Sequence, residues 1–427
     1  MLFQNSIHNS LTLRWLYIDF NSYFASVEQQ LNPELRDRPV VVVPVETDST
    51  SAIAASYEAK AFGIKTNTRI YDAKRICPNL VCVLAQHERY VEFHHRIIEE
   101  VNCHLPVTMV CSIDEVACRL MDNETSMKRS IEIAQSIKQG LAKNVGKYIR
   151  CSIGIAPNRY LAKVATDLQK PDGLTILPIE DLPQRLLNIQ LRDLPGIGFN
   201  MEQRLYNADV KNFSTLWNLD RKSMRKIWGS IWGEKMWYFL RGYELPEDEI
   251  KRHSLSHSHV MAPDLRDPSK AKFVARRLLL KAASRLRRMG YYACGFGLAV
   301  RLEAGLRIEK NMRCYRAQDS LTFLNMLDHL WKKIIQESKN ERIKKISLVV
   351  YDLIDEQKLK TELFKEWPDV NLKQRHKGEK ISKALDKINH RFGRDSILIG
   401  MLPSQGKSFS GSKIAFTRIP DREEFQE

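Results

Sequence analysis

Several features that would define whole classes of protein are missing from this chain. None of its eight cysteines forms a Cys-x-x-Cys pair, and no Cys/His spacing is typical of a zinc site. No apolar run approaches the roughly 20 residues that a membrane-spanning helix needs. No signal peptide is visible either. These absences predict a cytoplasmic protein with reduced thiols and no membrane partner.

Acidic residues are few relative to basic ones, and the imbalance is local. The 427 residues carry a formal net charge of +16, and 43% of them are hydrophobic, which is enough for several cores. Between Lys251 and Arg316, sixteen Lys and Arg residues stand against four Asp and Glu residues. Such a focused positive charge is typical of proteins that bind the phosphate backbone of nucleic acids. The alternative is a solvated basic face of a helix.

Carboxylates occur in two apolar segments that are far apart in the sequence. Asp19 ends an apolar run that begins at Trp15, and Asp114 and Glu115 lie in a second apolar stretch. An unpaired carboxylate in a buried strand loses its hydration at a high cost in free energy. Two neighbouring strands that share Mg²⁺ would remove this cost, because Mg²⁺ prefers carboxylate oxygens completed by substrate phosphates. The alternative is a polar pair at the end of a strand, solvated or bonded to a lysine.

Hydrophobic periodicity predicts strands and helices in an order without strict βαβ alternation, so we expect an α+β fold. We expect strands at 13–18, 39–45, 80–84 and 149–155, and one strand within 107–120 that carries Asp114 and Glu115. Helices are expected from residue 22 and over 57–62, 87–103, 126–146 and 158–169. A helical region follows over 182–240. A second α+β unit then has strands at 254–260, 292–303 and 343–353 and helices at 269–289 and 321–338.

Five motifs resemble those of the Y-family (UmuC/DinB-like) translesion DNA polymerases, in the same order and with similar spacing. They cover roughly the first 245 residues, and the resemblance weakens further along the chain. The motifs are Tyr17–Glu28, Ser56–Ile64, Ser112–Glu115, the segment Ser152–Asn158 with Leu161–Lys163 and Lys170–Gly173, and Leu194–Gly198.

The resemblance implies a right-hand polymerase with palm, small fingers, helical thumb and an α+β little-finger domain. It implies a palm at 12–27 and 87–176, fingers at 28–86 and a thumb with a helix-hairpin-helix at 177–243. A linker at 244–253, a little finger at 254–365 and an extension of unknown role at 366–427 would follow. The implied reaction is low-fidelity, template-directed DNA synthesis past damaged template. Its implied partners are primer-template DNA, dNTP and two Mg²⁺ ions.

The same resemblance implies residue roles at the active site. Asp19, Asp114 and Glu115 would be the catalytic carboxylates that bind the metal ions, joined by the backbone carbonyl of Phe20. The ring of Phe24 would exclude a 2′-hydroxyl and so select deoxynucleotides. The triphosphate would be bound by the side chains of Tyr57, Lys60 and Lys170 and by the backbone amides of Asn21, Ser22 and Tyr23.

Two positions depart from the family pattern. Lys60 stands where the family usually has arginine, so the planar two-pronged contact of a guanidinium is lost. Ala54 stands where the family often has a hydroxyl residue. Both changes remove contacts that would otherwise reach the triphosphate.

Further segments are candidates for binding DNA and a protein partner. Gly196, Ile197 and Gly198 form the expected hairpin of the thumb, which would approach a DNA phosphate closely. The basic helix presents Arg277, Lys281, Arg285 and Arg288, with an apolar stripe opposite, and is a candidate DNA-binding face. Leu359, Leu363 and Phe364 resemble a peptide that binds the bacterial sliding clamp, although such short motifs are common by chance.

Two other functions remain open from the sequence. A catalytically silent adaptor would keep the fold, bind DNA and the sliding clamp, and lose the carboxylates. A repair factor that uses only the hairpin and the basic helix would bind DNA in a salt-dependent way with no metal requirement. The presence of all three carboxylates favours the polymerase.

Overall fold

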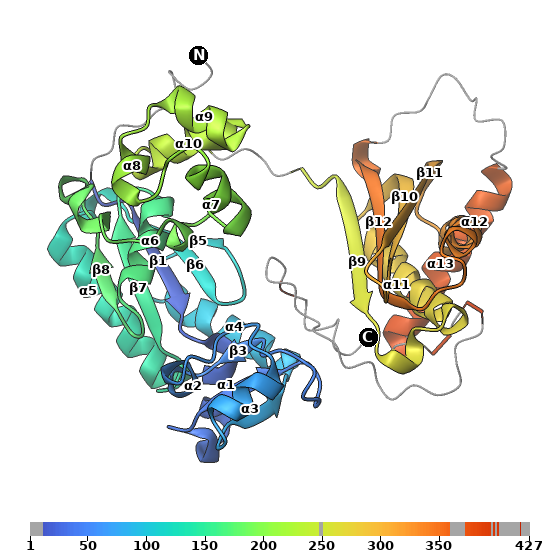
Figure 1. Ribbon diagram of the computed structural model, residues 1–427, viewed down its shortest axis with the longest axis horizontal. Helices are drawn as coiled ribbons and strands as arrows, with labels where there is room; N and C mark the ends of the chain where they lie inside the picture. Colours follow the sequence, from blue (N-terminus) through green and yellow to red (C-terminus); the bar gives the residue numbers. More distant parts are fainter. Residues whose placement is uncertain are drawn as a thin grey trace. The chain divides into compact units, whose positions relative to one another are not determined.

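The computed structural model describes residues 12–246, 251–358, 372–393, 396–397, 399–400 and 419. The described chain divides into two compact units, which meet in sequence between residues 246 and 251 (Figure 1). Among the described residues, no helix is both long and apolar enough to cross a membrane.

A five-stranded sheet in the order β5-β6-β1-β7-β8 is the centre of the first unit (Figure 1). The middle strand β1 runs antiparallel to both of its neighbours, whereas β7 and β8 are parallel. The strands are β5 (Val107–Val110), β6 (Glu115–Arg119), β1 (Trp15–Phe20), β7 (Cys151–Ala156) and β8 (Leu174–Ile176).

Helices bury both faces of this sheet, which explains why β1 is apolar on each side. Leu16, Ile18 and Phe20 pack with residues of α1, α4 and α5, whereas Trp15 and Tyr17 pack with residues of α6. The side chain of Asp19 belongs to this second face, because successive residues of a strand alternate. The helices are α1 (Tyr23–Leu31), α4 (His87–Asn102), α5 (Met127–Gly140) with a π-turn over Leu141–Val145, and α6 (Arg159–Leu168).

The expectation of a single strand within 107–120 is wrong. β5 and β6 are two antiparallel strands joined by a tight hairpin, and Asp114 lies in that hairpin while Glu115 opens β6. The run of apolar residues hides the turn, because no glycine, proline or asparagine marks it. The turn matters because it frees the Asp114 side chain from the alternation of the strand.

A small second sheet, in the order β3-β2-β4, packs with two short helices around its own apolar core. The helix α3 was not predicted from the sequence, because its helical pattern of apolar and charged residues is weak. The elements are β2 (Val40–Val43), β3 (Ala54–Ala55), β4 (Val81–Leu84), α2 (Tyr57–Ala61) and α3 (Ile70–Ile76).

Four helices follow and share an apolar core with α6. Local capping sets several of their boundaries. The Asp220 carboxylate accepts hydrogen bonds from the N–H groups of Lys222 and Ser223, and Gly229 ends the same helix in a left-handed conformation. The helices are α7 (Phe199–Tyr206), α8 (Phe213–Trp217), α9 (Arg221–Trp228) and α10 (Ile231–Leu240).

The second unit is a four-stranded antiparallel sheet in the order β11-β10-β12-β9, with helices on one side (Figure 1). The sequence missed β11, which alternates exposed charged residues with partly buried ones. The elements are β9 (Ser254–Val260), α11 (Pro268–Arg288), β10 (Tyr291–Leu302), β11 (Arg307–Ala317), α12 (Ser320–Glu337) and β12 (Ile343–Asp355).

Part of the C-terminal extension is a helix, α13 (Leu372–Phe392), that packs on α11 and α12. Both carboxylate oxygens of Asp386 accept hydrogen bonds from the buried guanidinium of Arg287, at 2.6 and 2.9 Å. The Ser382 hydroxyl accepts a hydrogen bond from the N–H of Ser320. The extension therefore thickens the helical layer of the second unit.

Candidate active site

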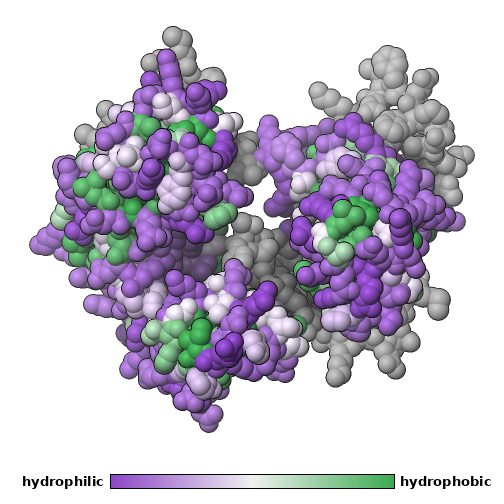
Figure 2. All heavy atoms as spheres, in the orientation of Figure 1, coloured by the Kyte–Doolittle hydropathy of each residue, from purple (hydrophilic) through white to green (hydrophobic). Residues whose placement is uncertain are grey.

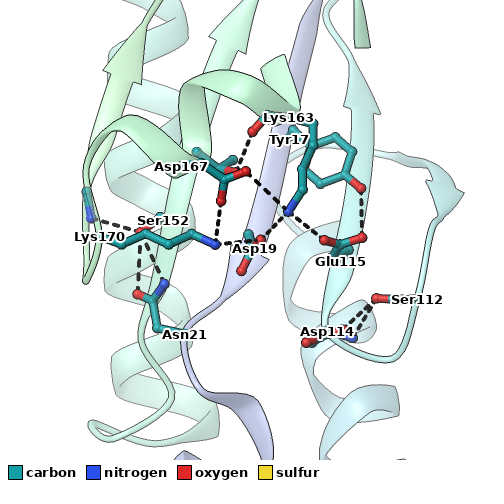
Figure 3. A network of polar contacts seen from close by, with 12 residues as sticks. Tyr17, Asp19, Asn21, Ser112, Asp114, Glu115, Ser152, Lys163, Asp167 and Lys170 are labelled. Carbon is teal, nitrogen blue, oxygen red and sulfur yellow. Dashed lines mark hydrogen bonds and ion pairs between the residues drawn. The ribbon is translucent and has the colours of Figure 1, made fainter. Parts of the chain in front are cut away.

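Residues from β1 and β6 bring two of the predicted carboxylates together. Asp19 and Glu115 are direct cross-strand partners, so their side chains share the face of the sheet that α6 covers. Asp19 is only 7% exposed. The hydroxyl of Tyr17, two residues before Asp19, donates a hydrogen bond to Glu115 at 3.1 Å (Figure 3). Residues almost a hundred positions apart in the sequence thus form one acidic centre.

Lys163 of α6 bridges these two carboxylates. Its ammonium group is 2.5 Å from Glu115 Oε1 and makes a short ion pair with Asp19 Oδ2 (Figure 3). Burial works against the charge of Lys163, but the negative charges of Asp19, Asp167 and Glu115 outweigh burial and raise its pKa. The acidic pair is therefore bonded to a lysine, which was one of the alternatives that the sequence left open.

Lys170 supplies a second cation from the loop after α6. Its ammonium group is 2.8 Å from both Asp19 Oδ2 and Asp167 Oδ1. Burial again opposes the charge, and Asp19 and Asp167 reverse its effect and raise the pKa of Lys170. Asp167 was not predicted, although its place four residues after Lys163 on α6 and three before Lys170 could have indicated this pairing.

Asp114 lies beside this network without a direct bond to it. The Ser112 hydroxyl donates to its carboxylate at 2.5 Å, and the N–H of Phe20 donates to its backbone carbonyl at 2.9 Å. Burial raises the pKa of Asp114, and the negative charges of Asp19 and Glu115 add to the increase. The three predicted carboxylates are thus close enough to repel one another.

The chemistry of this donor set fits a hard divalent cation. Asp19 and Glu115 of two paired strands and Asp114 of the hairpin before β6 approach one another in a partly buried place, and their mutual repulsion favours a bound positive charge. Among the residues that the structure describes, no group of three His, Cys, Asp or Glu side chains is arranged around a single metal position. The ammonium groups of Lys163 and Lys170 also pair with this acidic centre.

Asn21 has a role different from the predicted one. Its N–H donates to the carbonyl of Arg150 at 2.9 Å, so it is not available to a phosphate and that prediction is wrong. Its side chain instead donates to the Ser152 hydroxyl and accepts from the N–H of Asp172 at 2.8 Å. Since Asp172 follows Lys170 by two residues, Asn21 holds the loop that carries this cation (Figure 3).

Tyr57 and Lys60 extend the cationic side of the site from α2. The ammonium group of Lys60 lies over the Tyr57 ring, 4.3 Å from its centroid. Burial lowers the pKa of Lys60, and the positive charge of Lys170 lowers it further. Two lysines from different parts of the chain therefore lie close enough to act on one anion. Ala54 is buried in the core and offers no polar group.

The turn into α1 positions three predicted residues. Ser22 adopts a left-handed conformation, with φ 50°, immediately before the helix. The Tyr23 hydroxyl donates to the carbonyl of Tyr90 at 2.6 Å. The Phe24 ring is stacked on the Tyr90 ring, with centroids 4.3 Å apart and an interplanar angle of 14°. The residue expected to select the sugar is therefore held against a second aromatic ring.

Comparison with known proteins identifies the family. The sequence profile of the impB/mucB/samB family matches residues 18–167, and the profile of the C-terminal domain of that family matches 252–363. A third profile, described as the thumb domain of DNA polymerase iota, matches residues 192–244. The chain belongs to the impB/mucB/samB family.

The chain is also similar to named bacterial polymerases. The chain is 34% identical over 284 residues to DNA polymerase IV of Moorella thermoacetica, and this alignment covers 65% of this chain and 70% of the relative. It is 26% identical over 402 residues to DNA polymerase IV of Bacillus velezensis, and this alignment covers 92% of this chain and 94% of the relative. The predicted Y-family, DinB-like DNA polymerase is confirmed.

Solved structures agree on the fold. A Y-family DNA polymerase chimera of Dbh and Dpo4 matches with a TM-score of 0.69 at 22% identity, covering 80% of this chain and 99% of the chimera. DinB from Sulfolobus solfataricus matches with a TM-score of 0.52 at 22% identity and the same coverage. The α+β polymerase fold with thumb and little-finger domains is therefore confirmed.

The thumb hairpin of this polymerase is built around one necessary glycine. Gly196 has φ +91°, and a Cβ there would lie 3.3 Å from the Trp232 indole nitrogen. Gly198 precedes α7 and has open space around it. The side chain of Ile197 is buried, and its backbone N–H donates to the Leu194 carbonyl. Neither the side chain nor the N–H is therefore available to DNA, and the prediction of a DNA contact by Ile197 is wrong.

The basic helix of the little finger is α11, and its apolar stripe packs on the sheet as expected. Lys281 and Arg288 are exposed, whereas Arg277 and Arg285 are partly buried. Within this unit, no described element covers the opposite face of the sheet. That face carries a hollow of about 340 Å³ whose lining includes Arg301, Arg307, Lys344 and Lys345. Positive charge therefore lies on both sides of the little finger.

On the face drawn in Figure 2, hydrophilic residues dominate both units, and apolar patches are small and separate.

The predicted clamp-binding residues Leu359, Leu363 and Phe364 lie outside the described residues. Their role stays a prediction.

Proposed function

We propose that this polymerase copies damaged template DNA with low fidelity, by transferring a nucleotide from dNTP to a primer 3′-hydroxyl. The observation that carries the proposal is the convergence of Asp19, Glu115 and Asp114 beside lysines from α2 and from the loop after α6. Acidic residues that bind cations, next to lysines that bind phosphates, are what phosphoryl transfer requires.

We propose that Asp19, Asp114, Glu115 and the Phe20 carbonyl hold two Mg²⁺ ions. Such ions would neutralise charge on the attacking oxygen and on the leaving pyrophosphate. The remaining steps belong to the chain itself. Tyr17 orients Glu115 through its hydrogen bond, and the β1–β6 pairing holds the two strands in register.

The incoming triphosphate would be bound by Lys60, Lys170, Tyr57 and the amides of Ser22 and Tyr23. Lys60 and Lys170 lie close enough for the charge of one to lower the pKa of the other. A polyanion between them would remove this repulsion, so both lysines favour a bound triphosphate. The Phe24 ring would then exclude the 2′-hydroxyl of a ribonucleotide.

Primer-template DNA would be bound by the thumb and the little finger. Gly196 and Gly198 shape a turn at the start of α7, and the first N–H groups of a helix can bind phosphate because they have no partner within the helix. Arg277, Lys281, Arg285 and Arg288 of α11 remain candidates. The sheet face with Arg301 and Arg307 is a second candidate, because these arginines and two lysines line a hollow there.

The decisive experiment is primer extension on undamaged and lesion-containing templates with Mg²⁺ and dNTPs. We expect wild-type protein to extend both primers and Asp114→Asn to extend neither, while DNA binding and thermal unfolding are retained. If Asp114→Asn extends primers as well as wild type, the proposed catalytic centre is wrong.

The silent adaptor makes a different prediction. It would bind DNA and the sliding clamp without nucleotide turnover at any dNTP or Mg²⁺ concentration. The retained carboxylates disfavour it, and a dNTP titration separates the two functions. A DNA-binding repair factor would bind DNA with the same affinity in the presence and absence of Mg²⁺, with a steep salt dependence. Clamp binding and cytoplasmic location stay predictions.

A further inference from the structure

Lys163 occupies a place that the proposed chemistry reserves for a cation. Its ammonium group contacts one oxygen of Asp19 and one of Glu115, and it lies 4.0 Å from Asp167 Oδ2. The side chain is 20% exposed, so the two carboxylates face a lysine rather than bulk water. The ion pairs are charge-assisted, which makes them among the stronger hydrogen bonds in a protein.

A lysine and a metal ion compete for the same two carboxylates. An ammonium group donates hydrogen bonds to carboxylate oxygens, whereas Mg²⁺ binds those oxygens directly at roughly 2.1 Å. Lys163 already lies within hydrogen-bond distance of both Glu115 Oε1 and Asp19 Oδ2, so a metal ion bound to the same oxygens would lie close to its positive charge. The repulsion between the two cations favours a movement of the ammonium group away from the two strands.

Asp167 offers the displaced ammonium group a partner. It lies one helical turn after Lys163 on α6, and its other oxygen already binds Lys170 at 2.8 Å. The 4.0 Å separation between Lys163 Nζ and Asp167 Oδ2 can be closed by a rotation of the flexible lysine side chain. The charge of Lys163 thus stays paired when it leaves the two strands.

We propose that Lys163 is a displaceable internal counter-ion of the metal site, which moves from Asp19 and Glu115 toward Asp167 when a divalent cation binds. This inference rests on the proposed function, because it takes Asp19 and Glu115 as metal ligands. Lys163 keeps the acidic centre neutralised before metal arrives and weakens metal binding to the free polymerase. Asp167 is a positioning residue that lowers the cost of the displacement.

The test measures metal binding without DNA or nucleotide. Mn²⁺ is titrated into the full chain and free Mn²⁺ is counted by electron paramagnetic resonance, with Mg²⁺ competition as a second readout. We expect Lys163→Met to bind Mn²⁺ on the order of tenfold more tightly than wild type, since a competing charge-assisted bond is gone. Equal or weaker binding by Lys163→Met overturns the proposal.

The matched control is Lys138→Met. Lys138 also forms an ion pair with an aspartate near the site, but its partner is Asp172, at 2.6 Å, rather than Asp19 or Glu115. We expect its Mn²⁺ affinity to match wild type. If Lys138→Met tightens binding as much as Lys163→Met, a general change of charge explains the effect, and the proposal fails.

Asp167→Asn tests the second half of the proposal and remains informative if Lys163→Met does not fold. In this variant a neutral amide replaces the Asp167 carboxylate, so the Lys163 ammonium group has no new anionic partner and stays on Asp19 and Glu115. Mn²⁺ binding should therefore weaken several-fold. This loss should shrink in the double variant Lys163→Met/Asp167→Asn, because no ammonium group needs a new partner. An unchanged affinity in Asp167→Asn, or a fully additive double variant, contradicts the inference.

These outcomes are separate from the polymerase reaction itself. If wild-type protein extends primers but Lys163→Met binds Mn²⁺ no more tightly, only the counter-ion role fails. If wild-type protein neither extends primers nor binds Mn²⁺, the proposed function fails first.

Discussion

The ring of Phe24 lies nearly flat against the ring of Tyr90, 4.3 Å from centroid to centroid. Tyr90 is itself fixed, because its hydroxyl donates to the buried carboxylate of Glu28 at 2.6 Å and accepts from the N–H of Gln86 at 3.1 Å. Glu28 is 2% exposed, and burial raises its pKa. The ring proposed to select the sugar therefore rests on a second ring that a polar network holds in place.

This arrangement predicts that Tyr90 controls sugar selection through Phe24. In Tyr90→Leu the flat support is lost and Phe24 can tilt, so we expect ribonucleotide incorporation to rise about tenfold relative to deoxynucleotides. Single-nucleotide insertion kinetics with matched rNTP and dNTP measure the ratio. Tyr90→Phe is the control, because it keeps the stacked ring. Equal discrimination in Tyr90→Leu and wild type would show that Phe24 needs no support.

Sequence patterns predicted the parts of the site that lie on strongly apolar segments. Asp19 lies in a strand that reads as buried, and a buried carboxylate costs free energy unless a cation or hydrogen bonds compensate for its lost hydration. The sequence could not predict that Glu115 faces Asp19 while Asp114 does not, since this depends on a hairpin that the apolar run conceals. A one-residue change in register would have exchanged their two roles.

The sequence also could not predict which residues far apart in the chain are neighbours in the fold. The backbone N–H of Asn21 was expected to bind phosphate at the start of a helix, yet it donates to the Arg150 carbonyl because β1 and β7 continue their pairing to that point. The basic face of α11 was visible as a helical period, whereas the open sheet face was not, because its arginines come from two strands. One of those strands, β11, went unrecognised.

Asn21 is expected to matter through the loop that holds Lys170. Asn21→Ala removes the acceptor of the Asp172 N–H and leaves this loop less fixed, so we expect KM for dNTP to rise about tenfold with a smaller change in kcat. Steady-state insertion kinetics give the two parameters. Ser152→Ala, which loosens the same loop through Gly173, should change them in the same direction. An unchanged KM in both variants would contradict this role.

Lys60 offers a gain-of-function prediction. A guanidinium can bind two phosphate oxygens at once and still stack on the Tyr57 ring, so Lys60→Arg should lower KM for dNTP by about three- to tenfold. Steady-state single-nucleotide insertion with varied dNTP measures KM. Lys60→Met should raise KM by a similar factor. If the arginine variant binds dNTP more weakly than wild type, the lysine is adapted to its own geometry rather than a weaker substitute.

The two faces of the little finger can be compared by charge reversal. We expect Arg301→Glu with Arg307→Glu to weaken DNA binding. The slope of log K against log salt should become shallower by about 2, because about two phosphate contacts are lost. Lys281→Glu with Arg288→Glu reverses the same number of charges on α11. Fluorescence anisotropy at several salt concentrations measures both. If only the α11 pair weakens binding, the basic helix is the DNA-binding face and the open sheet face is not.

His259 predicts a pH dependence of stability in the little finger. It lies on β9 opposite Ile346, and burial with the nearby charge of Arg277 lowers its pKa to about 4. An unfolded chain protonates this histidine below about pH 6.5, whereas the folded chain stays neutral down to about pH 4. Between these values the unfolded state binds more protons, so stability falls as the pH falls.

The contribution of His259 to the free energy of unfolding is therefore complete above about pH 6.5 and is lost progressively toward pH 4. The slope for one proton is at most about 1.4 kcal/mol per pH unit. Denaturant unfolding at pH 7.5, 6 and 5 should show a smaller loss for His259→Gln than for wild type. His253→Gln alters an exposed histidine just before the same strand and should keep the wild-type loss. If both variants lose stability in parallel with wild type, other groups cause the acid sensitivity.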